Sequence, residues 1–231
     1  MADDESKVFL ITGASTGIGA ATARLAVEAG YRVVLSARSA DKLEALASEL
    51  GGDEHALAVP ADVSEWEENQ KLATAALDRF GRLDVVFANA GFGAQRSFLG
   101  DSPEHWREMV LTNVLGVAYT IRATLEHVRE RSGHMILTSS AAGRRAIPGS
   151  LYSATKHAVT AMGESLRQEL NGTGARVTLI EPGMVDTPFF DNPGEGRLEA
   201  EDVARVVMFA LSQPPHVDIN EVLMRPTAQD G

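Results

Sequence analysis

"VFLITGASTGIG" (residues 8–19) leads from an apolar stretch directly into a glycine-rich turn and then into a helical pattern. The glycines at 13, 17 and 19 allow a sharp turn and a close approach of the backbone to a ligand. Free N–H groups and the dipole of the following helix favour a pyrophosphate there. The spacing, G-x-x-x-G-x-G, differs from the G-x-G-x-x-G dinucleotide fingerprint, and such turns also occur without a ligand. Its position between a strand and a helix predicts a dinucleotide site.

The rest of the chain alternates between short apolar stretches and longer amphipathic ones. We expect strands at 8–12, 32–37, 55–61, 83–89, 134–140, 176–183 and 221–226. We expect helices at 17–29, 40–50, 64–80, 103–131, 151–171 and 200–213. Several strands are almost wholly apolar, as in a parallel sheet covered by helices on both faces. The pattern predicts an α/β fold: one doubly wound, Rossmann-like domain over residues 1–231, with about seven strands and a flexible N-terminus at 1–6.

Local signals refine these boundaries. Ser39 and Ser64 stand where helix N-caps are expected. The segment DTPFFDNPGEGR (186–197) is rich in proline and glycine and predicts a long mobile connection. Such a connection either covers a pocket or is a plain surface loop.

Composition limits the partners of the 231-residue chain. Its net charge of −11 opposes binding to nucleic acid and to anionic membranes, so a small-molecule partner is expected. The absence of cysteine excludes disulfides and thiolate chemistry. The six histidines are scattered, and no metal site is expected. The acidic N-terminus and the lack of a long apolar run predict a cytoplasmic protein.

YSATK (152–156) places a tyrosine four residues before a lysine. On a helix these positions share a face, so the phenol of Tyr152 and the ammonium of Lys156 would be neighbours. A free tyrosine has a pKa of about 10, and a nearby ammonium lowers that pKa. Ser153 and Lys156 also form S-x-x-K, typical of serine acyl-transfer enzymes, but the partner strings S-D-N and K-T-G do not occur. The stretch favours proton transfer by Tyr152 over acyl transfer by Ser153.

Six motifs together resemble those of the short-chain dehydrogenase/reductase family, in order and in setting. They are TGASTGIG (12–19), NAG (89–91), NVLG with Asn113, SSAAG (139–143), YSATK (152–156) and PGMVDT (182–187). The likeness spans residues 7 to 226. The stretch HVDINEVLMRPT (216–227) is further similar to the branch that contains 3-hydroxy acid dehydrogenases and clavulanate dehydrogenase.

The resemblance implies hydride transfer between a nicotinamide cofactor and a carbonyl or alcohol, which requires a proton donor near the oxygen. It implies that Tyr152 is the general acid/base and that Lys156 tunes it and holds the nicotinamide ribose. It assigns a proton relay to Asn113 and substrate orientation to Ser140. Counting back from Tyr152 favours Ser139 instead, but the S-x-x-G context favours Ser140. Consecutive strand residues face opposite sides, so only one serine reaches the site, and we expect Ser140.

The same resemblance implies which residues bind the cofactor. In addition to Tyr152 and Lys156 they are Gly13, Ser15, Thr16, Gly17, Ile18, Gly19, Arg38, Asp62, Val63, Asn89, Ala90, Gly91, Pro182, Gly183, Val185 and Thr187. NAD-type members carry an acid where this chain has Ala37, and Arg38 follows with a guanidinium suited to a 2′-phosphate. We therefore expect NADP(H) rather than NAD(H). The alternative is that Arg38 is only a solvated strand-end charge.

Substrate and assembly are less constrained. We expect an apolar pocket lined by Phe92, Ala94, Leu151, Met184, Phe189 and Phe190, which favours an uncharged carbonyl compound. The branch resemblance favours a small 3-hydroxy acid instead, with Arg144 and Arg145 as possible carboxylate ligands. The family implies a homotetramer, or a dimer, with the helices at 103–131 and 151–171 between subunits. A cofactor-binding sensor or scaffold without turnover is the alternative function.

Overall fold

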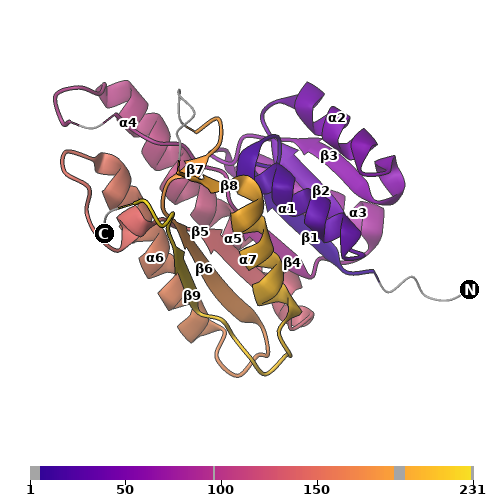
Figure 1. The fold of residues 1–231 in the computed structure, drawn as a ribbon. Coiled ribbons are helices and arrows are strands. Elements are labelled where there is room, and N and C mark those ends of the chain that lie inside the picture. The colour runs from indigo at the N-terminus through magenta and orange to yellow at the C-terminus, as the bar shows by residue number, and fades with distance from the viewer. Residues whose placement is uncertain (1–5, 96, 190–195, 230–231) are drawn as a thin grey trace, which may run out of the picture.

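The computed structural model describes residues 6–95, 97–189 and 196–229, and its centre is a seven-stranded, all-parallel sheet (Figure 1). The strands follow the order β3-β2-β1-β4-β5-β6-β9. They are β1 (Val8–Thr12), β2 (Arg32–Ala37), β3 (Ala56–Pro60), β4 (Val85–Ala88), β5 (His134–Thr138), β6 (Arg176–Pro182) and β9 (Glu221–Met224). The predicted doubly wound fold is confirmed. The strand order reverses between β1 and β4, and a crevice for a ligand forms at such a reversal, beyond the carboxyl ends of the strands.

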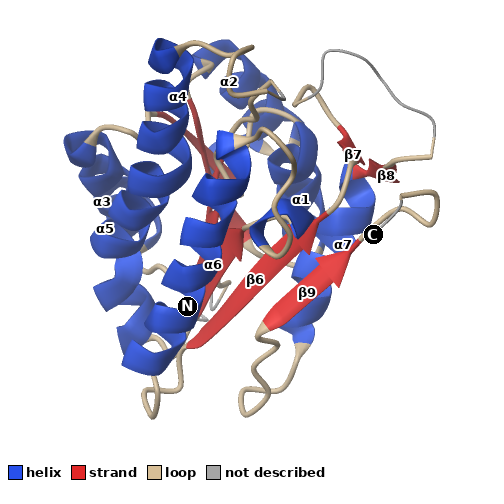
Figure 2. Cartoon of the chain, turned by 90° about the vertical axis from the view of Figure 1, so that its left-hand side faces the viewer, coloured by secondary structure: helices blue, strands red, loops and turns tan. Residues whose placement is uncertain are grey.

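Helices cover both faces of the sheet (Figure 2). They are α1 (Gly17–Glu28), α2 (Ala40–Glu49), α3 (Trp66–Phe80), α4 (Pro103–Val110), α5 (Val117–Glu130), α6 (Leu151–Glu169) and α7 (Ala200–Ser212). Alternate residues of β1 enter two different cores, because successive strand side chains point to opposite faces. Phe9 and Ile11 pack with α1, α2 and α7, whereas Val8 and Leu10 pack with α3, α5 and α6. This two-sided burial explains why the strands are so uniformly apolar.

The predicted helix over 103–131 is interrupted in the structure. Between α4 and α5 the chain makes a π-helical turn, η2 (Leu111–Gly116), which contains the buried Asn113. A π-helical turn inside a longer helix frequently marks a functional site. The interruption therefore places Asn113 at the point where the helix geometry changes.

Of the two predicted N-caps, Ser64 is wrong, and Ser39 occupies the N-cap position without making a capping hydrogen bond. Helix α3 begins at Trp66 with Glu65 as its N-cap, two residues later than expected. Both the N–H and the hydroxyl of Ser64 bind Asp62 Oδ1, at 2.9 and 2.7 Å, and this local turn competes with capping. Ser39 does occupy the N-cap of α2, but its side chain makes no capping hydrogen bond.

The proline- and glycine-rich connection at 186–197 is held at both ends. The two-residue strands β7 (Val185–Asp186) and β8 (Leu198–Glu199) pair in parallel, which the sequence pattern did not predict. Residues 190–195, including the expected pocket residue Phe190, lie outside the described residues. No helix in the described part of the chain is both long and apolar enough to cross a bilayer.

His134 starts β5 at the amino edge of the sheet and is buried. Its Nε2 lies 2.7 Å from Thr178 Oγ1, and that hydroxyl donates to the backbone oxygen of Ile219. Nε2 must therefore carry the proton, while Nδ1 has no hydrogen-bond partner among the described residues. Burial, with a contribution from Arg176, lowers the pKa of His134 to about 3. The folded protein thus disfavours the charged imidazole.

We predict that His134 makes the protein less stable in mild acid. Unfolded histidine has a pKa of about 6.5, so the unfolded chain binds the proton first and stability falls as pH drops from about 6.5 toward 3. His134→Gln keeps a donor for Thr178 and should lose about 2 kcal/mol less than the unmodified protein between pH 7 and pH 5. Urea unfolding at both pH values measures this difference. His216→Gln, at an exposed histidine, is the control, and equal losses in all three proteins would contradict the assignment.

Candidate active site

The glycine-rich turn links β1 to α1 with no room for larger side chains. Gly13 and Gly17 have φ values of 66° and 54°, which favour glycine. An ideal Cβ at Gly19 would lie 2.3 Å from the Gly13 carbonyl oxygen. Thr16 is the N-cap of α1 but makes no side-chain capping bond with any described residue. The first N–H groups of the helix are thus free of a side-chain cap, and the turn fits a pyrophosphate.

The carboxyl ends of β1, β4 and β5 are joined by one hydrogen-bond network. The Thr12 hydroxyl accepts from the backbone N–H groups of Asn89 and Ala90, at 3.0 and 3.1 Å. The Asn89 amide donates to the Thr12 oxygen at 3.1 Å and accepts from the Thr138 hydroxyl at 3.0 Å. The Asn89 side chain, expected to bind cofactor, is therefore engaged in holding three strands together. Neither Thr12 nor Thr138 is among the site residues predicted from the sequence, and their position at the ends of apolar strands was the available signal.

Tyr152 and Lys156 lie in the first turns of α6 beside this network. Lys156 is buried, and its ammonium donates to the Thr138 backbone oxygen at 2.7 Å. Lys156 Nζ also lies 5.6 Å from the centre of the Tyr152 ring. The helical spacing has brought the two side chains together.

Burial dominates the pKa values of this pair. It lowers the pKa of Lys156 to about 8 and raises the pKa of Tyr152 to about 12, with a hydrogen bond to Ser140 opposing the rise. The expectation that Lys156 lowers the pKa of the Tyr152 phenol below its ordinary value is wrong for the cofactor-free protein. Desolvation disfavours both charged forms, and the ammonium is directed to the Thr138 oxygen.

The two adjacent serines after β5 face different surroundings. The Ser140 hydroxyl lies near enough to the Tyr152 phenol to lower its pKa, and it donates to the Pro182 backbone oxygen at 3.3 Å. The Ser139 hydroxyl instead donates to the Lys156 backbone oxygen and lies 2.8 Å from the Thr160 hydroxyl. Ser140 is thus the serine that reaches Tyr152.

Asn113 fixes the loop after β4. Its Oδ1 accepts from the Phe92 N–H at 3.0 Å, and its Nδ2 donates to the Phe92 oxygen at 2.8 Å and to Thr155 Oγ1 at 3.3 Å. An ideal Cβ at Gly91 would lie 3.0 Å from Asn113 Oδ1 and 3.7 Å from Lys156 Nζ. The side-chain amide of Asn113 therefore holds the backbone of Phe92 in place close to Lys156. Thr155, a partner that the sequence analysis missed, is the third residue of the YSATK motif after Tyr152.

Ser153, the acyl-transfer candidate, is buried and its hydroxyl accepts from the Ile147 N–H at 2.9 Å. A nucleophile must be exposed to substrate and next to a base. Lys156, the partner in the S-x-x-K interpretation, instead donates a hydrogen bond to the Thr138 oxygen. The geometry favours a structural role for Ser153.

Arg144 is not available to a substrate carboxylate. Its Nε lies 2.8 Å from both carboxylate oxygens of the buried Glu181, and its guanidinium also pairs with Glu221. These two acids raise the pKa of Arg144 above its ordinary value. The idea of Arg144 as a carboxylate ligand is therefore wrong, because the acids that neutralise it come from β6 and β9.

The other expected cofactor residues surround the same carboxyl edge. A Cβ at Gly17 would lie 3.0 Å from the Thr187 methyl group, so the segment after β7 rests on the glycine turn. Arg38 is exposed directly after β2 and forms no hydrogen bond or ion pair with another described residue. Ala14 N–H donates to the Ser36 oxygen at 3.0 Å, which ties the turn to β2. The Val63 side chain is buried and packs toward Gly116.

Aromatic rings line one side of the site. The rings of Phe189 and Tyr152 meet edge to face at 5.7 Å, and a Cβ at Gly93 would lie 2.8 Å from the Phe189 ring. The Phe92 ring lies 5.2 Å from that of His105, whose Nδ1 is bound to Asp101. The Phe189 ring thus gives the site an aromatic surface beside Tyr152, whereas the Phe92 ring packs against an ion-paired histidine.

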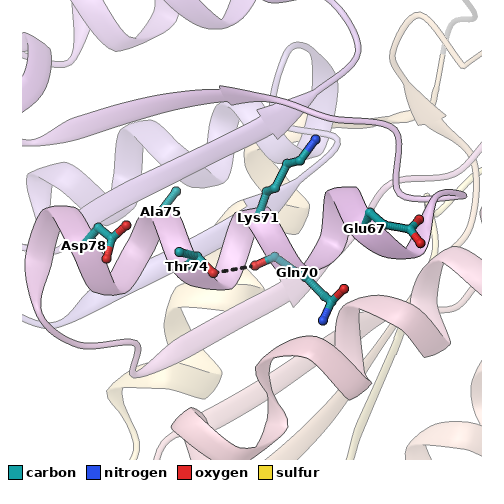
Figure 3. A pocket seen from close by; sticks show the side chains of 6 residues that line it. All are labelled: Glu67, Gln70, Lys71, Thr74, Ala75 and Asp78. Atoms are coloured by element: carbon teal, nitrogen blue, oxygen red, sulfur yellow. Dashed lines mark hydrogen bonds between the residues drawn. The ribbon is translucent and has the colours of Figure 1, made fainter.

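A shallow, open depression lies on the surface of α3 (Figure 3). It is lined by Glu67, Gln70, Lys71, Thr74, Ala75 and Asp78. All six come from this one helix, and the Thr74 hydroxyl donates to the Gln70 backbone oxygen. The lining contains none of the residues of the glycine turn or of the loops after β4, β5 and β6. The depression is therefore separate from the candidate active site.

Comparison with known proteins agrees with this geometry. The family model described as short chain dehydrogenase matches residues 7–197. The chain belongs to the short-chain dehydrogenase family. An uncharacterized oxidoreductase of Staphylococcus aureus (strain MRSA252) is 40% identical over 225 residues, which are 95% of this chain and 97% of the relative. The chain is accordingly an oxidoreductase that acts on CH–OH groups.

Solved short-chain dehydrogenases have the same fold over nearly the whole chain. An alcohol dehydrogenase from the archaeon Thermococcus sibiricus, complexed with 5-hydroxy-NADP, has a TM-score of 0.91 and 35% identity, covering 98% of this chain and 99% of that one. Serine dehydrogenase from Escherichia coli has a TM-score of 0.88 and 31% identity, covering 97% and 100%. Other solved relatives hold NADP, NADH or NAD. These relatives indicate a nicotinamide cofactor.

We predict that Gly19→Ala abolishes tight cofactor binding. Its Cβ would meet the backbone of Gly13 and Ala14 at 2.3 to 2.9 Å, which forces the turn to move. Gly30→Ala is the control: nothing lies within 4 Å of its Cβ, so that variant costs only the backbone strain of φ 85°. Titration of each variant with NADPH measures the effect. Unchanged affinity in Gly19→Ala, or equal losses in both variants, would contradict a pyrophosphate site at this turn.

Proposed function

We propose that this protein interconverts a carbonyl and an alcohol with NADP(H), with Tyr152 as general acid in reduction and general base in oxidation. The observation that supports this most is the convergence of Ser140, Tyr152 and Lys156 beside the glycine turn. When bound, the nicotinamide would donate or accept the hydride. The protein's own groups must then supply orientation and the proton.

The hydroxyl groups of Ser140 and Tyr152 form the site for the carbonyl oxygen of the substrate. The two side chains lie side by side, and a carbonyl oxygen placed between them can accept from both once Ser140 turns its proton away from the Pro182 oxygen. With a pKa raised to about 12, the Tyr152 phenol is protonated at neutral pH, as a general acid in reduction requires. Lys156, with a pKa of about 8, is mostly charged at pH 7 and stabilises the phenolate that remains after proton transfer.

The surroundings of the oxygen site favour a neutral, apolar carbonyl compound over a 3-hydroxy acid. Arg144 is neutralised by Glu181 and Glu221. Phe189 adds an aromatic surface next to Tyr152. An anionic substrate would gain little from such a wall, whereas a flat apolar group would bury its surface against it.

We also propose a homotetramer with the helices of 103–131 and 151–171 between subunits. Val110 and Leu115, next to and within η2, are large apolar residues left 37% exposed in the single chain. Exposed apolar side chains on neighbouring turns support an interface at this helix.

We predict that Tyr152→Phe lowers kcat by about 10² or more, the usual scale of a general acid–base contribution. The substitution removes only the phenol oxygen, so NADPH affinity should stay nearly unchanged. Cofactor oxidation with a panel of aldehydes and ketones measures turnover, and fluorescence titration measures binding. Tyr119→Phe, which removes a phenol remote from YSATK in the sequence, is the matched control. Near-normal turnover in Tyr152→Phe would rule out this role.

We predict a preference for NADPH over NADH of about 10 to 10³ in kcat/KM, as one or two charge-assisted hydrogen bonds to a 2′-phosphate would give. The preference should reverse when Ala37→Asp is combined with Arg38→Val, because the acid binds the ribose hydroxyls and repels the phosphate. Arg129→Ala, which removes another exposed arginine, should leave the ratio unchanged. The ratio is measured at matched ionic strength. Equal kcat/KM for both cofactors in the unmodified enzyme would exclude the role of Arg38.

A further inference from the structure

The C-terminal end of the described chain folds back over the loop that follows β6. After β9 the backbone turns, with the Gln229 N–H donating to the Pro226 oxygen at 3.0 Å. The turn directs the Gln229 side chain to Met184, whose N–H donates to Gln229 Oε1 at 2.8 Å. Gln229 thereby connects two loops that are 45 residues apart in the sequence.

The Gln229 side chain also lies directly over Gly183. An ideal Cβ at Gly183 would lie 2.3 Å from Gln229 Oε1 and 3.1 Å from its Cδ. The φ of Gly183 is not among the positive values, so its backbone does not itself demand glycine. The amide of Gln229 occupies the space that a side chain at 183 would need.

The segment from Pro182 to Met184 is thus held at each of its three residues. The Pro182 oxygen accepts from the Ser140 hydroxyl at 3.3 Å, and the Gly183 N–H donates to the Met224 oxygen at 2.7 Å. Gln229 supplies the third contact, at Met184. Two of these three contacts come from the end of the chain, and the other comes from the serine next to Tyr152.

We propose that Gln229 is a positioning residue that sets the Pro182–Met184 segment against the nicotinamide half of the cofactor. This inference rests on the proposed function, in which that segment borders the nicotinamide. The adenosine half would lie near Arg38 and the glycine turn, on other strands. Loss of the Gln229 amide should therefore affect one half of the cofactor and spare the other.

The test compares Gln229→Ala with Gln229→Glu, which keeps an acceptor for Met184 N–H, and with Thr227→Ala, an exposed residue of the same turn. Calorimetry measures binding of NADPH and of adenosine 2′,5′-bisphosphate, a probe of the adenosine half alone. Turnover and melting temperature are measured in parallel.

We expect Gln229→Ala to weaken NADPH binding about tenfold, as the loss of one part-buried hydrogen bond allows, and to lower kcat. Binding of adenosine 2′,5′-bisphosphate should remain as in Thr227→Ala, and Gln229→Glu should recover most of the NADPH affinity. Equal weakening of both ligands would indicate a merely structural residue and overturn the inference, as would a Gln229→Ala protein that behaves like Thr227→Ala. If the unmodified protein bound NADPH no more tightly than adenosine 2′,5′-bisphosphate, both the proposed function and this inference would be overturned.

Discussion

The hydrogen bond from the buried Lys156 ammonium to the Thr138 oxygen is the contact on which the active-site geometry depends. A buried charge is tolerated only when it is paired or hydrogen-bonded, so the backbone must offer an acceptor at this point. The acceptor is present because β5 ends at Thr138. The same residue binds Asn89 through its hydroxyl, and Asn89 in turn binds Thr12. Displacement of the ammonium would therefore disturb the ends of three strands.

The parallel sheet accounts for the meeting of these residues. All seven strands point the same way, so the loops that follow β1, β4, β5 and β6 emerge at one edge. The glycine turn, Asn89 and Ser140 come from three of these loops, and α6 adds Tyr152 and Lys156 one turn apart. The proton donor is thus built on a helix, whereas the groups that surround it come from strand ends. A rigid placement of this kind is what hydride and proton transfer to one carbonyl require.

The fold was largely predictable because its signals are local. Runs such as Val8–Thr12 are apolar on both faces, and the strand–glycine–helix order places the turn correctly. The prediction of an N-cap at Ser64 was wrong because the Ser64 hydroxyl donates to the nearby Asp62 carboxylate instead. The π-helical turn contains Asn113, whose partner Phe92 lies 21 residues away in the sequence, and no local pattern indicated the turn.

The sequence predicted which residues form the site better than it predicted their pKa values and charge partners. The i, i+4 spacing correctly brings Tyr152 and Lys156 together, yet it cannot show how deeply they are buried, and burial sets both pKa values. Arg144 was misjudged for a similar reason: its two carboxylate partners come from strands that are distant in sequence. Thr12 and Thr138 appear in the sequence as unremarkable strand ends, and their role emerges only when the strands lie side by side.

A crystal structure of the complex with NADPH would test the central claim most directly. We expect the pyrophosphate at the N-terminus of α1 and the nicotinamide between Gly183 and Tyr152. We also expect Lys156 Nζ to be in hydrogen-bond contact with both the Thr138 oxygen and the nicotinamide ribose. A nicotinamide bound away from Tyr152, or a Lys156 ammonium detached from Thr138, would show that this arrangement is wrong.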